Sequence, residues 1–473
     1  MLKVCDDYNL FVLMSPLNFI RTDIQAMSAY MVQPAAGMVK LDAMENPYTL
    51  SPDLQAELGR RLGAVALNRY PSQRVEDLKT ALQTYVDMPA GYSLMLGNGS
   101  DELISLLSLA CQAPGAVALA PEPGFVMYAL STQLQGLSYV PVSLTADFEL
   151  DEAAMAAAIA QHQPAIVYLA YPNNPSANLW DAAVIRRLIA QVSVYGGWVV
   201  LDEAYQPFSS LTWWDEIRRD PAANAQVLLM RTLSKFGLAG VRIGYMLGRA
   251  EVIAHIDKIR PPYNISVLNA ECALFALEHQ AVFQAQAQAI RSERERMSAA
   301  LGLLNGVKVF PSQANMLLVR FEGAEDIATR LFEGLRKRGI LVKNVSKMHP
   351  LLRRCLRPSV GTPQENDVFL AALTELWTPL AWILKSINPW RAIWSSMWSK
   401  KPMPVDKSDC PVPSRLTRTL IWVSLVSRLT SAMRGVMVAF SVSIGPLRLR
   451  GRHCFLRAFP PRGVNNGAAK DAF

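Results

Sequence analysis

The chain of 473 residues has few of the residues that form metal sites and disulfide frameworks. Its five histidines and six cysteines lie far apart, with no CxxC pair and no HExxH motif. Motifs of the GxSxG and GxxxxGK[ST] types are absent as well. We therefore predict no metal site, no disulfide framework, no nucleophile elbow and no phosphate-binding P-loop, and reduced thiols in a cytoplasm are the simplest interpretation of the cysteines.

The sequence also lacks a long uncharged apolar run. The longest one near the C-terminus, Gly435 to Leu447, has 13 residues, where a membrane-spanning helix needs about 20. Leu10 to Ile20 is apolar but follows Asp6 and Asp7 instead of a basic region, which argues against a secretory signal. We therefore expect no membrane as a partner.

Positive charge is scarce outside the C-terminal segment. The chain has 47 Lys and Arg against 39 Asp and Glu, but residues 378–473 hold 15 of the basic and 3 of the acidic residues. Residues 1–377 therefore carry a charge of −4, with no basic stripe for nucleic acid. We interpret 378–473 as a disordered basic tail outside the folded domains, whose Arg, Trp, Ser and Pro content resembles frame-shifted translation. An interaction tail or a membrane-surface helix is the alternative.

What the chain does have is enough apolar sequence for at least two packed units, with 51% hydrophobic and 18% charged residues. Between residues 70 and 262, short apolar runs alternate with helical segments, which predicts an α/β unit with a mostly parallel sheet covered on both faces. The predicted strands are Ala116 to Ala120, Ala165 to Ala170, Trp198 to Leu201, Val227 to Met230 and Ile243 to Leu247.

A smaller α+β unit is predicted over 263–377. We expect a long helix over about 266–301 and a last helix that begins at the capping box Thr362-Pro363-Gln364-Glu365. Residues 1–29 are expected to be a disordered extension, and 30–69 an arm that belongs partly to the smaller unit and contains a helix after Ser51-Pro52. The predicted strands of the unit are Val307 to Phe310, Met316 to Phe321 and Ile340 to Val342.

Polar residues gather at several strand ends and helix starts, where ligands of open α/β sheets bind. The segment 97–102 is either an anion site at a helix start or an ordinary N-cap, and 171–176 is either a ligand-binding turn or a plain Asn-Pro turn. Asp202 ends an apolar strand and is either functional or a solvated strand end. The segment 231–242 places hydroxyls, a lysine and an arginine beside a turn.

Taken in order, motifs in these and other segments resemble a known family. Over about residues 30–377 the chain resembles the fold-type I pyridoxal-phosphate aminotransferases, in particular the histidinol-phosphate aminotransferase branch. The resemblance implies a large domain over 70–262 that binds pyridoxal 5'-phosphate, a smaller domain over 263–377, and a cytoplasmic homodimer. The motifs are Glu45-Asn46-Pro47-Tyr48, Asn68-Arg69-Tyr70-Pro71, Gly97-Asn98-Gly99-Ser100-Asp101-Glu102, Pro172-Asn173-Asn174-Pro175, Asp202-Glu203-Ala204-Tyr205, Thr232-Leu233-Ser234-Lys235 and Leu356-Arg357.

The same resemblance implies roles for the groups around the cofactor ring. Lys235 would form a Schiff base with the cofactor and carry a proton to and from the substrate. Asp202 would pair with the pyridine nitrogen. Asn174 and Tyr205 would hydrogen-bond the ring oxygen, and Phe125 would stack on the ring.

Cofactor phosphate and substrate would be held by a second set of groups. The resemblance places the phosphate on the helix start at Ser100 and Asp101. Further phosphate contacts would come from Thr232, Ser234 and Arg242, and from Tyr70 of the other subunit. Arg357 would clamp the substrate α-carboxylate, and Lys343 would lie near the substrate phosphate unless it is a solvated strand-end lysine. Asn46 belongs to the substrate-side loop.

Some residues depart from the family pattern: Ser176-Ala177 stands where Thr-Gly is usual, and Pro358 follows Arg357 directly. The expected activity is amino transfer between L-histidinol phosphate and 2-oxoglutarate in histidine biosynthesis. An aromatic aminotransferase or a phospho-amino-acid decarboxylase of the same fold is the alternative. A regulator with a DNA-binding module would need a helix-turn-helix before residue 40, where the sequence is too short and irregular.

Overall fold

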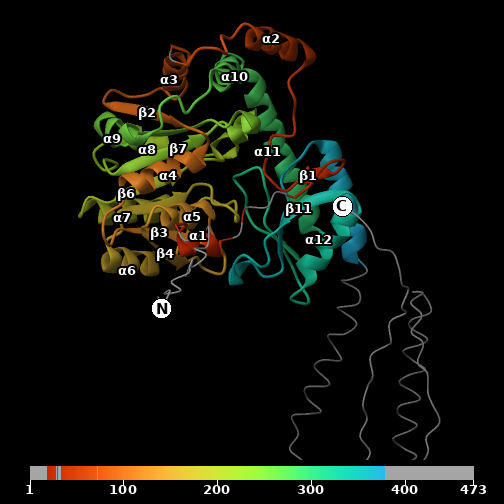
Figure 1. The fold of residues 1–473 in the computed structure, drawn as a ribbon. Helices are drawn as coiled ribbons and strands as arrows, with labels where there is room; N and C mark the ends of the chain where they lie inside the picture. The colour runs from red at the N-terminus through yellow and green to blue at the C-terminus, as the bar shows by residue number, and fades with distance from the viewer. Residues whose placement is uncertain (1–16, 18, 28, 30–32, 72, 379–473) are drawn as a thin grey trace, which may run out of the picture. The chain divides into compact units, whose positions relative to one another are not determined.

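The computed structural model describes residues 17, 19–27, 29, 33–71 and 73–378 (Figure 1). The predictions for the basic tail, apart from residue 378, and for most of the N-terminal extension fall outside these residues. Inside the extension, Thr22–Ala26 forms a short helix, α1, and Arg21 donates a hydrogen bond to the carbonyl of Leu134 at 2.8 Å. Five residues are too few to show a helical pattern in the sequence, so nothing predicted this helix.

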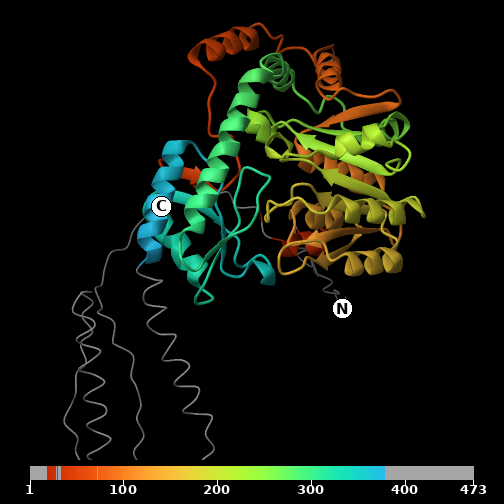
Figure 2. The same cartoon turned by 180° about the vertical axis from the view of Figure 1, so that it is seen from behind.

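The larger part of the fold is built on a seven-stranded sheet (Figures 1 and 2). Its order is β2-β8-β7-β6-β5-β3-β4, with β8 antiparallel to both neighbours and the remaining pairs parallel. The predicted mostly parallel sheet is thereby confirmed. The strands are β2 (Tyr92–Gly97), β3 (Val117–Glu122), β4 (Ser138–Ser143), β5 (Ile166–Ala170), β6 (Trp198–Asp202), β7 (Val227–Thr232) and β8 (Gly244–Arg249).

Two strands of this sheet, β2 and β4, were not predicted. β4 forms one edge, its side chains are largely exposed or half-buried, and Pro141 interrupts its apolar character. Edge strands lack the continuous apolar run of a strand buried on both faces. The sequence of β4 therefore gives only a weak indication of a strand, because β4 has a neighbouring strand on one side only.

Both faces of the large sheet are buried, and side chains alternate between them. In β6, Val199 and Leu201 belong to one apolar core, and Val200 belongs to the other. Asp202 therefore faces the second core and Glu203 the first. The first core contains α3 (Gln73–Tyr85), α6 (Glu152–His162), α7 (Ala182–Ser193), α8 (Trp213–Arg219) and α10 (Val267–Glu278); the second contains α4 (Ser100–Ala110), α5 (Met127–Leu134) and α9 (Ala250–Ile256).

A five-stranded sheet of order β1-β11-β12-β10-β9 forms the second part of the fold. β1 is parallel to β11, and the other pairs are antiparallel. Helices α11 (Gln280–Gly302), α12 (Ile327–Lys337) and a last helix over 363–378 pack into its core. The N-terminal arm thus supplies a strand to a sheet otherwise made near the C-terminal end of the fold. The strands are β1 (Val39–Leu41), β9 (Val307–Val309), β10 (Val319–Phe321), β11 (Ile340–Asn344) and β12 (Cys355–Arg357).

The two predicted helix starts are confirmed, but one predicted long helix is two helices in the structure. Ser51 caps α2 (Pro52–Gly63) by accepting from the N–H of Leu54, and Thr362 and Glu365 form the expected reciprocal capping box. The single helix expected over about 266–301 is wrong, because it is two helices, α10 and α11, separated at His279 (Figure 2). α10 packs on the large-sheet core and α11 leads to the second sheet, so tertiary packing decides the break.

None of the described helices is both long and apolar enough to cross a membrane.

Candidate functional site

A cavity of about 110 Å³ lies at the carboxyl ends of β5, β6 and β7. Residues from six segments far apart in the sequence meet there, and they include all the groups predicted to hold the cofactor within one chain. The lining residues are Met44, Ser100, Asp101, Phe125, Tyr128, Ala170, Pro172, Asn174, Asp202, Ala204, Tyr205, Thr232, Ser234, Lys235 and Arg242.

Lys235 enters the cavity from a short π-helical turn, Ser234–Leu238, that follows β7. Gly237 in this turn has φ 145°, and a Cβ there would lie 2.7 Å from the Phe283 ring, so the turn requires glycine. The Lys235 Nζ donates to the carbonyl of Ala43 at 3.0 Å. Burial, together with the nearby Arg357 guanidinium, lowers the pKa of Lys235 to about 8. The neutral, nucleophilic form of the amine is therefore far more populated near neutral pH than it would be in an exposed lysine, at roughly a tenth of the molecules at pH 7.

Asp202 ends β6 and is 3% exposed. Its Oδ2 accepts from the Tyr128 hydroxyl at 2.7 Å, and its Oδ1 accepts from the backbone N–H of Ala204 at 3.0 Å. Burial raises the pKa of Asp202 to about 6, although both hydrogen bonds lower it. A buried carboxylate of this kind is stabilised by a cationic partner, which would return its pKa toward the ordinary value.

Asn174 connects two other predicted residues. Its Nδ2 donates to the Tyr205 hydroxyl at 3.0 Å, and its Oδ1 accepts from Nη1 of Arg357 at 2.5 Å. Nη2 of Arg357 donates to the carbonyl of Asp42 at 2.9 Å. Arg357 ends β12, so the five-stranded sheet supplies a guanidinium beside a cavity formed by the seven-stranded sheet. Pro358, which follows it, accepts a backbone hydrogen bond from Leu317 and leaves the Arg357 side chain directed at Asn174.

The start of α4 forms a cradle with Arg242. Gly99 precedes the helix with φ 79°, and a Cβ there would lie 2.5 Å from Nη2 of Arg242. A Cβ on Gly244 would lie 2.6 Å from the carbonyl carbon of Gly99. Glycine at both positions therefore lets the guanidinium and the first turn of α4 come together. Backbone N–H groups at a helix start, a guanidinium and nearby hydroxyls are typical of a phosphate site.

The arrangement of amine, carboxylate and anion cradle has a counterpart in a known family. The sequence profile of the class I and II aminotransferases matches residues 36–373. The chain belongs to this aminotransferase family. It is 63% identical over 354 residues to the histidinol-phosphate aminotransferase of Polaromonas naphthalenivorans (strain CJ2), which covers 75% of this chain and 95% of that relative.

Two further relatives agree with this aminotransferase assignment. The histidinol-phosphate aminotransferase of Paracidovorax citrulli (strain AAC00-1) is 60% identical over 366 residues, covering 76% of this chain and 98% of that relative. The crystal structure of histidinol-phosphate aminotransferase from Sinorhizobium meliloti in complex with pyridoxal-5'-phosphate matches with a TM-score of 0.67 and 26% identity. It covers 78% of this chain and 100% of that chain. The predicted fold type and the predicted cofactor are confirmed.

The aminotransferase cavity fits pyridoxal phosphate by its own chemistry. A buried amine of lowered pKa can bond an aldehyde, and a buried carboxylate can hold a protonated pyridine nitrogen. The cradle at Gly99 and Arg242 offers donors to a phosphate. Each functional group of the cofactor therefore has a complementary group in this chain.

Four predicted site residues do not line this cavity. Arg357 lies beside it and contacts Asn174. Tyr70 is 76% exposed, and its ring stacks on Tyr263 with 4.4 Å between centroids. Asn46 lies behind the Lys235 turn, where its Nδ2 donates to the side chain of Gln286 and to the carbonyl of Phe236. Lys343 is half-buried on β11.

Sequence reasoning missed Tyr128. It lies one helical turn after Phe125, and the two rings meet edge to face with 5.5 Å between centroids. Tyr128 also stacks on Tyr168 at 4.6 Å and donates its hydroxyl to Asp202. Phe125 lies just before α5, and the N–H of Tyr128 donates to its carbonyl at 3.2 Å, so the spacing of three residues is the signal that could have placed the two rings on one side of this turn.

The departure at Ala177 has a structural consequence. Ala177 has φ 66°, in the left-handed region that favours the glycine usual in the family. Its methyl group is fully buried, and its carbonyl accepts from the N–H of Gln313 at 2.7 Å. Apolar burial and this hydrogen bond therefore offset the backbone strain beside the Asn174 turn.

Proposed function

We propose that this aminotransferase moves the amino group of L-histidinol phosphate to 2-oxoglutarate, giving imidazole-acetol phosphate and L-glutamate, in histidine biosynthesis. The observation that supports it most is the pairing of Lys343 with Arg357 across β11 and β12. Directly opposite residues of antiparallel strands share one face of the sheet. A guanidinium beside the cavity with a second cation opposite it on the same sheet face suits a site that must accept both an α-carboxylate and a phosphate ester. The names of the relatives at 60–63% identity agree with this substrate.

The residues of the chain divide the work of the reaction. When bound, pyridoxal phosphate supplies an electron-poor ring that accepts electrons from the substrate Cα–H bond. Lys235 would hold the cofactor covalently, and its neutral Nζ would move the proton at the substrate α-carbon. Asp202 would keep the ring nitrogen protonated. Asn174 and Tyr205 would donate to the ring oxygen.

A second set of residues would position the cofactor and the substrate. Phe125 would pack on the ring face. Ser100 and Asp101 at the start of α4, with Thr232, Ser234 and Arg242, would hold the cofactor phosphate through backbone N–H groups, hydroxyls and a guanidinium. Arg357 would hold the α-carboxylate of glutamate, Lys343 the phosphate of histidinol phosphate, and Asn46 would support the substrate-side loop.

We also propose a cytoplasmic homodimer in which Tyr70 reaches the cofactor phosphate of the partner subunit. Within this chain, most of the surface of Tyr70 and most of that of Leu67 is exposed. An exposed aromatic pair of Tyr70 and Tyr263 beside an exposed leucine is typical of a surface that a partner covers. The division into an arm over 30–69, a large domain over 70–262 and a small domain over 263–377 belongs to the same proposal.

A comparison of amino donors tests the substrate. With 2-oxoglutarate as acceptor, kcat/KM for histidinol phosphate should exceed that for phenylalanine or tyrosine by on the order of 10²-fold, because the aromatic amino acids leave one cation of the Lys343–Arg357 pair without a phosphate. Comparable turnover of the aromatic amino acids would support the aromatic aminotransferase instead. Release of carbon dioxide from a phospho-amino acid would support the decarboxylase.

Tyr128→Phe should lower kcat on the order of tenfold while leaving the fold intact. The Tyr128 hydroxyl lowers the pKa of Asp202, so its removal should raise that pKa further. The acid limb of the pH–rate profile should therefore move to higher pH, which kcat measured across pH would record. Tyr168→Phe is the matched control, because that hydroxyl contacts Ser108 and leaves Asp202 untouched. An equal shift in both variants would contradict the role of Tyr128.

A further inference from the structure

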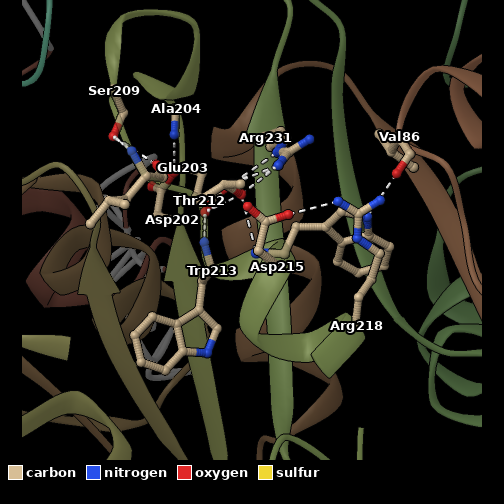
Figure 3. A network of polar contacts seen from close by, with 12 residues as sticks. Val86, Asp202, Glu203, Ala204, Ser209, Thr212, Trp213, Asp215, Arg218 and Arg231 are labelled. Atoms are coloured by element: carbon tan, nitrogen blue, oxygen red, sulfur yellow. Dashed lines mark hydrogen bonds and ion pairs between the residues drawn. The ribbon is translucent and has the colours of Figure 1, made fainter. Parts of the chain in front are cut away.

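Directly behind Asp202, on the opposite face of the large sheet, lies a buried ion pair of Glu203 and Arg231 (Figure 3). The side chains are 0% and 8% exposed, and Nε of Arg231 donates to Oε2 of Glu203 at 2.9 Å. Glu203 shares the face of Leu201, and Arg231 shares that of Leu229. Neither is among the residues that line the cavity.

The start of α8 closes this pair with hydrogen bonds. The Thr212 hydroxyl donates to the Glu203 carboxylate, with its oxygen 2.8 Å from Oε1 and 2.9 Å from Oε2, and it accepts from Nη2 of Arg231 at 2.8 Å. The backbone N–H of Trp213 donates to Oε1 of Glu203. Tyr245 on β8 also hydrogen-bonds Arg231. Both charges are therefore withdrawn from water and fully partnered, which is the condition under which a buried pair is tolerated.

The pair lies where β6 and β7 leave their hydrogen-bond ladder. The last residues in register are Asp202 and Met230, and the N–H of Glu203 donates to the carbonyl of Met230 at 2.8 Å. Glu203 follows Asp202 directly, and Arg231 precedes the turn that carries Lys235. The Glu203–Arg231 side-chain pair therefore continues the contact between the two strand ends one position beyond the last paired residues of the ladder.

We propose that Glu203 and Arg231 are a positioning pair that fixes the Asp202 carboxylate relative to the Lys235 amine. The inference rests on the proposed function for the roles of Asp202 and Lys235. Glu203 acts through the adjacent peptide on Asp202, and Arg231 acts through β7 on the turn of Lys235. The proposed effect is one of geometry. The charge of Glu203 by itself raises the pKa of Asp202, so its removal alone would strengthen Asp202 as a counter-ion, which is opposite to the effect of misplacing the carboxylate.

The effect of the ion pair on the geometry of the site can be measured apart from its effect on folding stability, because both charges can be removed together. A well-packed apolar pair of similar volume often replaces a buried ion pair without loss of stability, whereas removing one partner leaves an uncompensated charge. Glu203→Gln alone should therefore unfold at a clearly lower temperature than the wild type. The double variant Glu203→Leu/Arg231→Met should unfold near the wild-type temperature.

The test titrates the holoenzyme of the double variant by its visible spectrum. The pH at the midpoint of the change in the cofactor's visible absorption, the spectral midpoint, should be higher than in the wild type by roughly one pH unit. A misplaced Asp202 leaves the ring nitrogen without its proton, and a neutral ring nitrogen no longer repels the proton on the Lys235 nitrogen. At the same time kcat should fall on the order of tenfold, with KM for 2-oxoglutarate nearly unchanged, because the pair does not touch substrate.

Arg218→Met is the matched control. Arg218 lies on α8 close to the Glu203–Arg231 pair (Figure 3). It is 38% exposed and pairs with Asp215 at 2.6 Å and with Asp87 at 2.8 Å, and neither partner belongs to β6 or β7. The spectral midpoint of Arg218→Met should equal that of the wild type.

A folded double variant with the wild-type spectral midpoint would overturn the proposal, as would an equal shift in Arg218→Met. If the double variant does not fold, Arg231→Lys tests the proposal instead, because lysine keeps the positive charge but lacks the guanidinium with its several N–H donors. An unchanged spectral midpoint in Arg231→Lys would overturn the proposal too. A wrong substrate assignment would show itself separately, since the wild type would then fail to transaminate histidinol phosphate while the spectral shift between variants remained.

Discussion

Lys235→Ala should abolish amino transfer, lowering kcat by on the order of 10⁴-fold or more. The variant loses the amine that would both bond the cofactor and move the substrate proton, and among the residues that the structure describes no second lysine lines the cavity. Activity with histidinol phosphate and 2-oxoglutarate gives the first measurement. Borohydride reduction of the wild type followed by peptide mass spectrometry should place the cofactor mass on Lys235, and the variant should carry none.

The control for this variant is Lys308→Ala, which removes an exposed lysine paired with Asp147 and should leave activity and cofactor attachment unchanged. A Lys235→Ala protein that kept covalent cofactor and amino transfer would contradict the assignment.

The lowered pKa of Lys235 gives this first prediction a pH dependence. The amine is neutral above its pKa of about 8, and it would be neutral only above the ordinary value of 10.5 if it were exposed. Cofactor uptake by cofactor-free protein should therefore speed up as pH rises toward about 8 and level off above it. A rate that kept rising toward pH 10 would show that Lys235 is not desolvated as the structure describes.

Asp202→Asn should keep the fold and part of the cofactor but lower kcat by roughly 10²- to 10⁴-fold. A neutral amide has no charge with which to hold a proton on the ring nitrogen, so the electron-accepting power of the cofactor falls. The amide oxygen can still accept from the N–H of Ala204, and the amide NH2 can donate to the hydroxyl oxygen of Tyr128, which is why the strand end should stay in place. Steady-state kcat and the cofactor content of the purified protein measure the two effects.

The pH profile distinguishes this charge effect from a change of shape. In the wild type, activity should fall as pH drops through the pKa of Asp202, because the protonated acid can no longer serve as the counter-ion. The asparagine variant has no such group, so its remaining activity should lose that acid limb. Asp87→Asn, at an exposed carboxylate paired with Arg218, is the control and should leave the profile unchanged. A wild-type rate in Asp202→Asn would contradict the role.

The sequence by itself determined the central strands of the large sheet and the identity of most of the cavity. Strands such as β5 and β7 are buried on both faces, so their residues form short apolar runs that no surface helix would show. The polar residues after them, Asn174, Asp202 and Lys235, then fall at one edge because parallel strands end together. Local helix starts were equally readable, since the capping box at Thr362 and Glu365 depends on four residues alone.

Tertiary structure alone decided which distant groups reach this edge. β1 and β12 are three-residue strands with no periodicity to detect, yet their pairing with β11 brings Arg357 to Asn174 across 183 positions of sequence. The hydroxyl of Tyr128 meets Asp202 across 74 positions, and Glu203 meets Arg231 across 28. Local sequence sets the face on which a side chain lies, but the partner it meets there depends on strand order and helix packing, which arise from burial of the whole core.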